Sequence, residues 1–244
     1  MKSIFWKEIN SFFSSTIGFV VVGVFLVLLG MIMWIFPDFS ILDNQFASLD
    51  TLFYIAPLVF LFLIPAITMK SFSEETQSGT FEILFTKPLR DWDIILGKYF
   101  AALALAIIAI APTLLYYISV YYLGSRKGNL DTAGIIGSYF GLILLAACFC
   151  AIGVFASSLS QNQIIAFLIA VFLCFLLFWG FFFLSKLPFF YGNGDDLMQE
   201  LGIDYHYQSI SRGYIDLSDI LYFLVVIFAF LSATLFYISK RKFS

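Results

Sequence analysis

Ionisable side chains gather most densely between Lys70 and Lys98, in a polar stretch that separates two long apolar segments. Charges of both signs occur there, on Glu74, Glu75, Glu82, Asp91, Asp93, Lys70, Lys87, Arg90 and Lys98. A charged loop of this size between apolar segments is typical of a surface that recognises a partner or regulates the protein. The sequence therefore predicts a docking or regulatory surface in this stretch.

Other side chains that could carry chemistry are few and scattered. His206, the sole histidine, has no Cys, Asp or Glu cluster at ligand spacing, so we interpret it as an interfacial polar residue. The cysteines lie in apolar runs and are interpreted as small hydrophobic residues, and the methionines form no ligand cluster (Cys148, Cys150, Cys174; Met31, Met33, Met69, Met198). We expect no catalytic residue, no metal and no cofactor.

The composition places the chain in a membrane. Of its 244 residues, 61% are hydrophobic and 12% are charged, and the mean hydropathy is +0.97. Soluble domains are about half apolar and about a quarter charged. No basic cluster indicates nucleic-acid binding, and residues 1–15 lack the residue order of a cleavable signal.

Hydropathy predicts an all-α integral membrane protein, with a single transmembrane domain over residues 1–244 and six spans. About 20 residues cross the hydrocarbon core at a rise of about 1.5 Å per residue. Pro57 and Pro65 predict a kinked or broken second span, and Pro112 lies in the middle of the third. The predicted spans are residues 17–36, 52–69, 99–123, 133–157, 164–184 and 220–238.

Residues 1–15 alternate bulky and charged side chains at helical spacing, which places Phe5, Ile9, Phe12 and Phe13 on one face. The pattern predicts an amphipathic helix in the headgroup region. The alternative is that these residues are the frayed start of the first span.

The distribution of Lys and Arg orients the spans. An even number of spans places both termini on the side of loop 70–98, and the loop 185–218 on the other side. The first side holds nine basic residues and the second holds four (Lys2, Lys7, Lys70, Lys87, Arg90, Lys98, Lys240, Arg241, Lys242; Arg126, Lys127, Lys186, Arg212). The positive-inside rule therefore predicts that both termini are cytoplasmic.

The predicted spans contain no Lys, Arg, Asp or Glu. Ion-coupled carriers and intramembrane hydrolases keep ionisable or catalytic groups at membrane depth, so the pattern argues against both. A phosphate loop is also missing, because Gly97-Lys98 is followed by Tyr99 and lacks the required preceding glycine. We therefore predict a non-catalytic chain, with any ATP hydrolysis in a separate subunit.

Small residues occur at close-packing spacing in two spans. Gly137 and Gly141 form a small-x-x-x-small step in the fourth span, and Ala102 and Ala106 form one in the third. Such steps let helices approach closely. Two interpretations stay open, packing within one chain and contact between two copies.

A longer pattern follows the second span, E-x-x-x-G-T-x-E-x-L-x-x-x-P, formed by Glu75, Gly79, Thr80, Glu82, Leu84 and Pro88. With the six spans and the N-terminal helix, it resembles the permease subunit of an ABC-2 type exporter. The stretch HYQSISRGYID at residues 206–216, the chain length and the Phe-rich spans are most similar to the gliding-motility-associated ABC transporter permeases of Bacteroidetes. The resemblance covers essentially the whole chain.

The resemblance implies that two permease copies, or one copy and a paralogue, pair in the bacterial inner membrane and bind two cytoplasmic ABC ATPase subunits. Loop 70–98 would form a short coupling helix seated in a cleft of the ATPase. The docking residues would be Glu75, Gly79, Thr80, Phe81, Glu82, Leu84, Phe85 and Pro88.

These residue types suit that role. Gly79 would end one helix and Thr80 would cap the next, which Pro88 would stop. Phe81 and Phe85 are one turn apart, so both could act as apolar anchors. The acidic residues of the loop would meet basic groups of the ATPase or pair with local Lys and Arg residues. The alternative is a capped cytoplasmic hairpin without a partner.

Two functions therefore stay open. The first is an ATP-driven exporter in a gliding-motility system, for which Phe- and Leu-rich spans fit a lipidic or amphipathic substrate. The second is a membrane anchor that transmits movement to an envelope machine without a transported substrate, with the outer loop 185–218 as the contact to an envelope partner.

Overall fold

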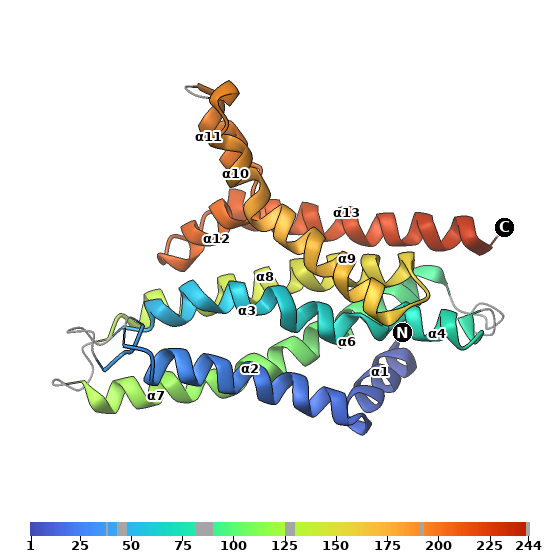
Figure 1. Cartoon of the computed structure of the whole chain (residues 1–244), viewed down its shortest axis with the longest axis horizontal. Coiled ribbons are helices and arrows are strands. Elements are labelled where there is room, and N and C mark those ends of the chain that lie inside the picture. The colour runs from blue at the N-terminus through green and yellow to red at the C-terminus, as the bar shows by residue number, and fades with distance from the viewer. Residues whose placement is uncertain (38, 43–47, 82–89, 125–129, 191–192, 243–244) are drawn as a thin grey trace.

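The computed structural model describes the chain except for residues 38, 43–47, 82–89, 125–129, 191–192 and 243–244 (Figure 1). Those described residues form helices and no strand. The main helices are α1 (Lys2–Ser14), α2 (Thr16–Trp34), α3 (Asp50–Thr68), α4 (Lys70–Gln77), α6 (Asp91–Ile110), α7 (Leu114–Leu123), α8 (Thr132–Leu159), α9 (Gln163–Phe175), α10 (Phe181–Ser185), α11 (Asn193–Glu200), α12 (Ile203–Ser211) and α13 (Leu217–Lys242).

Five of the helical stretches are long and apolar enough to cross a membrane, and a sixth crossing results if α1 and α2 count as one bent pair. The bend between Lys2–Ser14 and Gly18–Trp34 is 72°. A bilayer core leaves no water for unpaired backbone groups, so helices of this length satisfy their own hydrogen bonds there. The fold class predicted from the sequence is confirmed: the protein is an all-α integral membrane protein.

The prolines of α3 do not break it. The helix runs unbroken through Pro57 and Pro65, and the interruption lies at Met69, where α4 begins. Ser157 of α8 bridges this junction: its Oγ donates to the Met69 carbonyl at 2.9 Å and accepts from the Phe72 N–H at 2.9 Å. A break at Pro57 or Pro65, one of the two predicted outcomes, is therefore wrong, and Ser157 of α8 satisfies the backbone groups at the Met69 junction instead.

Pro112 has a local effect on the third span. It lies in a 3-10 turn, η1 (Ala111–Thr113), that joins α6 to α7 without ending the span. The continuous stretch Asp91–Leu123 has 33 residues, so at about 1.5 Å per residue it is about 50 Å long. This length exceeds a hydrocarbon thickness of about 30 Å, an excess that allows the helix to tilt in the membrane.

Helix α8 is the centre of the bundle and packs against α3, α6, α9, α12 and α13. Its small residues allow this close packing. A Cβ on Gly153 would lie 2.1 Å from Thr68 Oγ1 of α3, and one on Gly141 would lie 2.8 Å from Ile210 Cγ2 of α12. The small-residue step of the fourth span therefore packs against another helix of the same chain.

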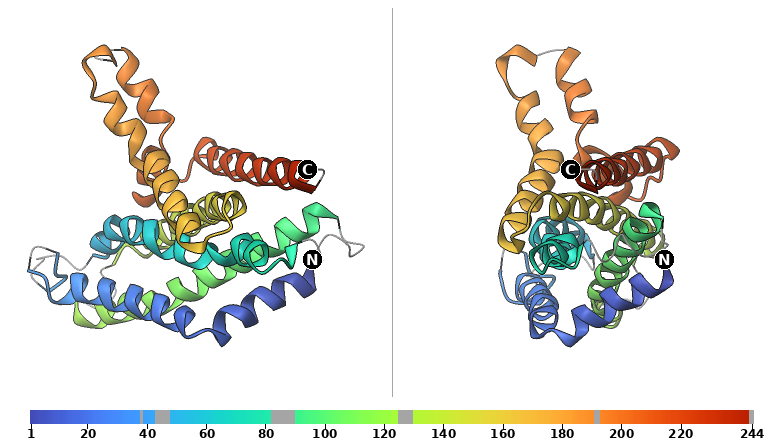
Figure 2. Two further views of the ribbon diagram at one scale, coloured as in Figure 1. Left: turned by 45° about the vertical axis from the view of Figure 1, so that its right-hand side comes forward. Right: turned by 90° about the vertical axis from the view of Figure 1, so that its right-hand side faces the viewer.

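Helices α9, α10 and α13 lie at the edge of the bundle (Figure 2). The apolar windows of Gln163–Ser185 and Leu217–Arg241 are only 22% and 17% buried. Between α9 and α10 lies a π-helical turn, η2 (Leu176–Gly180), and a short 3-10 turn, η3 (Pro188–Phe190), precedes α11. The exposed sides of these helices face lipid or another chain.

The two termini and α4 lie at the same end of the molecule (Figure 1). Arg241 near the end of α13 reaches α4, with its Nη1 3.5 Å from Thr76 Oγ1. Helix α12 and the start of α3 lie at the opposite end. This arrangement agrees with an even number of crossings.

Candidate functional site

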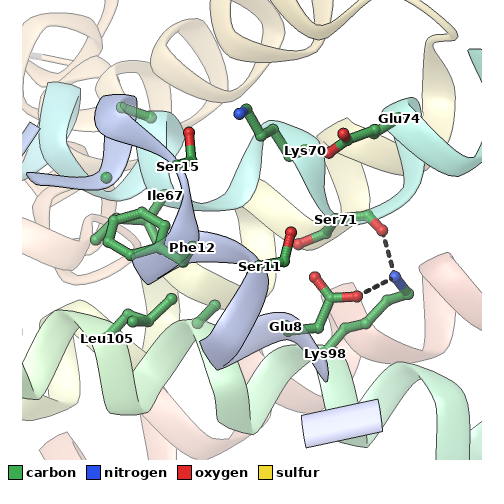
Figure 3. A pocket seen from close by; sticks show the side chains of 13 residues that line it. Glu8, Ser11, Phe12, Ser15, Ile67, Lys70, Ser71, Glu74, Lys98 and Leu105 are labelled. Carbon is green, nitrogen blue, oxygen red and sulfur yellow. Dashed lines mark hydrogen bonds and ion pairs between the residues drawn. The ribbon is translucent and has the colours of Figure 1, made fainter. Parts of the chain in front are cut away.

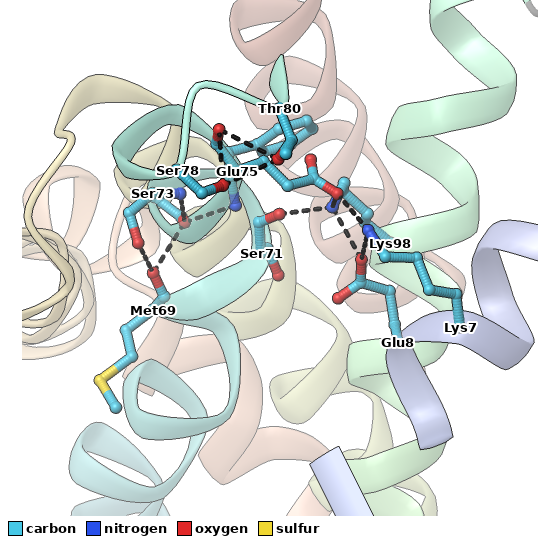
Figure 4. A network of polar contacts seen from close by, with 11 residues as sticks. Lys7, Glu8, Met69, Ser71, Ser73, Glu75, Ser78, Thr80 and Lys98 are labelled. Atoms are coloured by element: carbon cyan, nitrogen blue, oxygen red, sulfur yellow. Dashed lines mark hydrogen bonds and ion pairs between the residues drawn. The ribbon is translucent and has the colours of Figure 1, made fainter. Parts of the chain in front are cut away.

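The strongest concentration of buried charge surrounds Lys98 of α6 (Figure 4). Its side chain is completely buried, and its Nζ donates to Glu8 Oε1 of α1 at 2.8 Å and to the Ser71 carbonyl of α4. Glu75 Oε1 of α4 lies 3.0 Å from the same amine. One ammonium group therefore joins three helices that are far apart in the sequence.

The sequence around Lys98 explains its burial. Ile94, Ile95 and Ala102 share its side of α6 at helical spacing, and all three are buried. Because its neighbours pack against α1 and the rest of the bundle, the Lys98 side chain starts inside the protein and reaches only internal acceptors. A buried ammonium group requires such pairing.

Lys7 of α1 completes the cluster. Its Nζ lies 2.6 Å from Glu75 Oε1, and its side chain is 57% exposed while that of Glu75 is 10% exposed. Partial burial alone would lower the pKa of Lys7, but the hydrogen bond and charge of Glu75 outweigh it, so the pKa is raised. We call Lys7, Glu8, Glu75 and Lys98 the charge cluster; its two cations and two anions balance.

One atom of the charge cluster is unsatisfied. Glu75 Oε2 is buried and has no hydrogen-bond partner among the described residues. A small pocket lies beside the cluster, with Glu8, Ser11, Lys70 and Lys98 on its wall (Figure 3). The cluster therefore contains a buried carboxylate of which only one oxygen is paired. Small displacements of α1 relative to α4 would change this pairing.

Aromatic contacts connect the charge cluster to the C-terminal helix. Lys98 Nζ lies 4.9 Å from the centre of the Phe72 ring, and that ring lies 6.4 Å from the Phe81 ring. The Arg241 guanidinium carbon in turn lies 5.2 Å from the centre of the Phe81 ring. A displacement of Phe81 would therefore disturb contacts made by both α4 and α13.

The structure describes four of the predicted docking residues. Gly79 has a φ of +69° and follows the end of α4 at Ser78, as predicted. Thr80 Oγ1 lies 3.3 Å from the Glu75 carbonyl, so it also closes α4, and Phe81 follows it. Glu75 pairs with local amines within the chain, one of the two outcomes expected for the acidic residues. Glu82, Leu84, Phe85 and Pro88 lie outside the described residues.

Sequence reasoning missed Lys7, Glu8 and Lys98. Lys7 and Glu8 were assigned to an amphipathic helix in the headgroup region and Lys98 to the cytoplasmic loop 70–98, whereas Lys98 lies inside α6 and is fully buried. The available signal was the apolar pattern on both sides of Lys98, which continues the buried face of the third span without interruption. Glu8 carried no such signal, because its pairing with Lys98 depends on how α1 folds back.

His206 lies at the opposite end of the molecule and joins α12 to α13. Its Nε2 lies 2.8 Å from the Glu200 carbonyl, its Nδ1 lies 2.7 Å from Asp219 Oδ1, and its ring stacks on Tyr222 at 3.9 Å. A carbonyl oxygen only accepts, so the proton of this bond is on Nε2. His206, interpreted from the sequence as an interfacial polar residue, thus connects α12 to α13 through its ring nitrogen and its stacking on Tyr222.

Fold and site together define a multi-pass helical membrane protein that carries a charge cluster where its N-terminal helix meets the loop after the second span. Residues 2–188 match the family described as ABC-2 family transporter protein, so the chain belongs to this family. It is a transmembrane permease subunit, and the family implies an ATPase partner. Comparison with curated proteins gives no match.

Proposed function

We propose that this permease couples ATP hydrolysis in a separate cytoplasmic ATPase to export across the inner membrane, and that it does so as a dimer. The observation that carries the proposal is the charge cluster. It fastens α1, α4 and α6 to one another directly before the segment that the sequence pattern assigns to the coupling helix.

The geometry supports a lever mechanism. Helix α4 continues α3 beyond Met69 and ends at Gln77, directly before the turn at Gly79, so a force applied after Gly79 acts on α4. Lys98 passes this force to α6, and Glu8 passes it to α1. Because ion pairs between buried groups are directional and stiff, the three helices would move together when the ATPase closes.

The test separates docking from coupling. Phe85→Ala and Glu82→Arg are expected to abolish co-purification of the permease with its cognate ATPase while the spans stay folded. Glu8→Gln is expected to keep co-purification but to lower ATPase-driven transport in proteoliposomes. Lys2→Met, which removes an exposed charge of α1, serves as the control. Unchanged co-purification of both loop variants would overturn the docking role.

The gliding-motility assignment is supported by the sequence resemblance at residues 206–216, which the structure places in α12 and the turn after it. The second candidate, a mechanical anchor, is supported by the projecting arm that α10 and α11 form beyond the bundle (Figure 2). ATPase stimulation by an amphiphilic substrate in liposomes would favour export. Stimulation only by an envelope protein would favour the anchor.

A further inference from the structure

A large cavity, open on one side, lies at the end of the molecule that carries α12. Its volume is about 980 Å³, and it extends between α2, α3, the π-helical turn η2 and α12. The walls are mostly apolar and aromatic, and they include Met31, Phe53, Leu58, Phe178 and Trp179. A cavity of this size and lining fits the apolar body of a lipid-like molecule.

Helix α12 gives the cavity a polar side. Asp204, Gln208 and Arg212 follow one another at intervals of four residues and therefore lie on one face. Tyr207, on the same face, fixes the helix to α3 because its hydroxyl donates to the Phe53 carbonyl at 2.7 Å. The polar side is thus held in place by a buried contact.

The cavity wall carries more acidic than basic side chains. Asp50, in the first turn of α3, joins Asp204 there, while Arg212 is the basic residue of the lining. Gln208 donates to Asp204 Oδ2 at 2.7 Å, but within the described ranges neither carboxylate forms an ion pair with a Lys or Arg. Two carboxylates beside an apolar chamber attract a cation that carries an apolar body.

We propose that this cavity binds amphiphiles with an amine head group, with the head at Asp50 and Asp204 and the apolar body between α2, α3 and η2. The inference rests on the proposed export function, for which it names the substrate class. Amine-bearing lipids and soluble alkylamines share this chemistry. A head group with only anionic character would meet two carboxylates against the single Arg212 and is disfavoured by the net charge of the wall.

The binding test uses the full chain in nanodiscs of phosphatidylcholine. Two fluorescent probes share a diphenylhexatriene body, one with a trimethylammonium head and one with a propionic acid head. Energy transfer from Trp179 to each probe is measured over a concentration series. We expect saturable transfer to the cationic probe, transfer to the anionic probe that rises only with its membrane concentration, and loss of the saturable part in Trp179→Phe.

Charge variants locate the head group. Asp204→Asn and Asp50→Asn are each expected to weaken binding of the cationic probe at least about fivefold. Glu200→Gln removes the same charge from the neighbouring α11 without touching the cavity wall and should leave binding unchanged. Equal binding of both probes, or equal weakening by Glu200→Gln and Asp204→Asn, would overturn the proposal.

Competition identifies the source of the ligand. Displacement of the cationic probe by phosphatidylethanolamine in the nanodisc indicates a lipid, and displacement by added dodecylamine alone indicates a soluble amphiphile. The assay needs no ATPase, so its result is independent of the docking experiment. If the loop variants show that the ATPase does not dock while the probe still binds, the proposed export function is rejected and the proposed binding site is retained.

Discussion

At the scale of single residues, Lys98 has the largest predicted effect on stability. Its amine is the shared partner of Glu8 and Glu75, and it is completely buried. Lys98→Met would leave Glu8 and Glu75 with only the largely exposed Lys7 as a cation, so we expect a loss of about 3 kcal/mol in the free energy of unfolding. Thermal or denaturant unfolding in detergent measures it, with Lys2→Met, expected within about 0.5 kcal/mol of wild type, as the control.

A double-mutant cycle tests whether Lys98 and Glu75 act as a pair. Glu75→Gln alone should also destabilise the protein, because it leaves Lys98 with a single charged partner. In the double variant Lys98→Met/Glu75→Gln, the second change removes one of the carboxylates that lost Lys98 as a partner. The loss in the free energy of unfolding should therefore be smaller than the sum of the two single losses by about 1 kcal/mol or more. Additive losses would contradict a direct interaction.

The partly buried Asp204 predicts that the stability of the folded protein depends on pH. Burial raises its pKa from 3.8 to about 6, and the hydrogen bond from Gln208 only partly offsets this rise. Asp50 of α3 and Arg212 and Tyr207 of α12 line the same cavity. Since the unfolded chain loses this proton at lower pH, the folded state is favoured below pH 4 and loses that advantage as pH rises through 6.

Asp204→Asn should therefore stabilise the protein at pH 8 by about 1 kcal/mol, after allowance for solvent screening, and should have no such effect near pH 4. Melting temperatures of both proteins over this pH range measure the difference. A variant that is more stable at pH 8 yet binds the cationic probe less tightly would show that the buried carboxylate is kept for function. Equal stability at pH 8 would contradict the effect of burial.

The residue types at the charge cluster were readable from the sequence, but their pairing was not. The pattern after the second span marked Glu75 and Gly79, and Gly79 indeed has the positive φ that ends α4. Lys98 was placed in solvent because hydropathy sums a window and does not show which helix face a charge occupies. Its pairing with Glu8 depends on the bend between α1 and α2, which no local pattern encodes.

At the scale of helices, the contact between α8 and α12 helps to position α12, which forms one wall of the cavity. Gly141 and Gly137 offer a matched pair of substitutions on α8. A Cβ on Gly141 would lie 2.8 Å from Ile210 Cγ2, whereas one on Gly137 would meet its nearest atom at 3.6 Å. We therefore expect Gly141→Ala to cost about 1–2 kcal/mol and Gly137→Ala less than about 0.5 kcal/mol.

Gly141→Ala and Gly137→Ala also test whether the position of α12 affects binding in the cavity. Displacement of α12 by Gly141→Ala should weaken probe binding in the cavity, and Gly137→Ala should leave it unchanged. Unfolding and probe binding are measured on the same preparations. Similar behaviour of the two variants would contradict the close contact with Ile210.

The helices themselves were largely predictable, because apolar length alone indicates a membrane crossing. The effects of proline were not. Pro57 and Pro65 lie within one unbroken helix, and the interruption at Met69 is closed by Ser157, which is 88 residues away from it. The π-helical turn η2 also carries no clear local signature. In each case a distant side chain or a packing contact decides the backbone geometry.

At the scale of the whole molecule, the two candidate sites lie at opposite ends of the same helices. The charge cluster seats α4, which continues α3, while Asp50 and Phe53 at the start of α3 line the cavity. Helix α8 packs against both α3 and α12. A displacement of α4 therefore has a short mechanical route to the cavity along α3, which suits a protein driven by an ATPase at one end.

This arrangement makes a prediction about orientation. Cys148, Cys150 and Cys174 are fully buried, so a membrane-impermeant maleimide should react only with introduced cysteines. With both termini cytoplasmic, Ser3→Cys and Gln77→Cys should be labelled only in inverted membrane vesicles. Asp196→Cys on α11 and Ser218→Cys at the start of α13, both in or next to the predicted outer loop 185–218, should be labelled in intact spheroplasts.

The labelling pattern also decides the number of crossings. Helices α1 and α2 complete the sixth span only if they act as one bent pair, in which case residues 3 and 77 share a side. Labelling of Ser3→Cys from outside and Gln77→Cys from inside would leave α2 and α3 with a single crossing between them. It would also separate Glu8 from Glu75 and Lys98, so the charge cluster and the lever built on it would both be rejected.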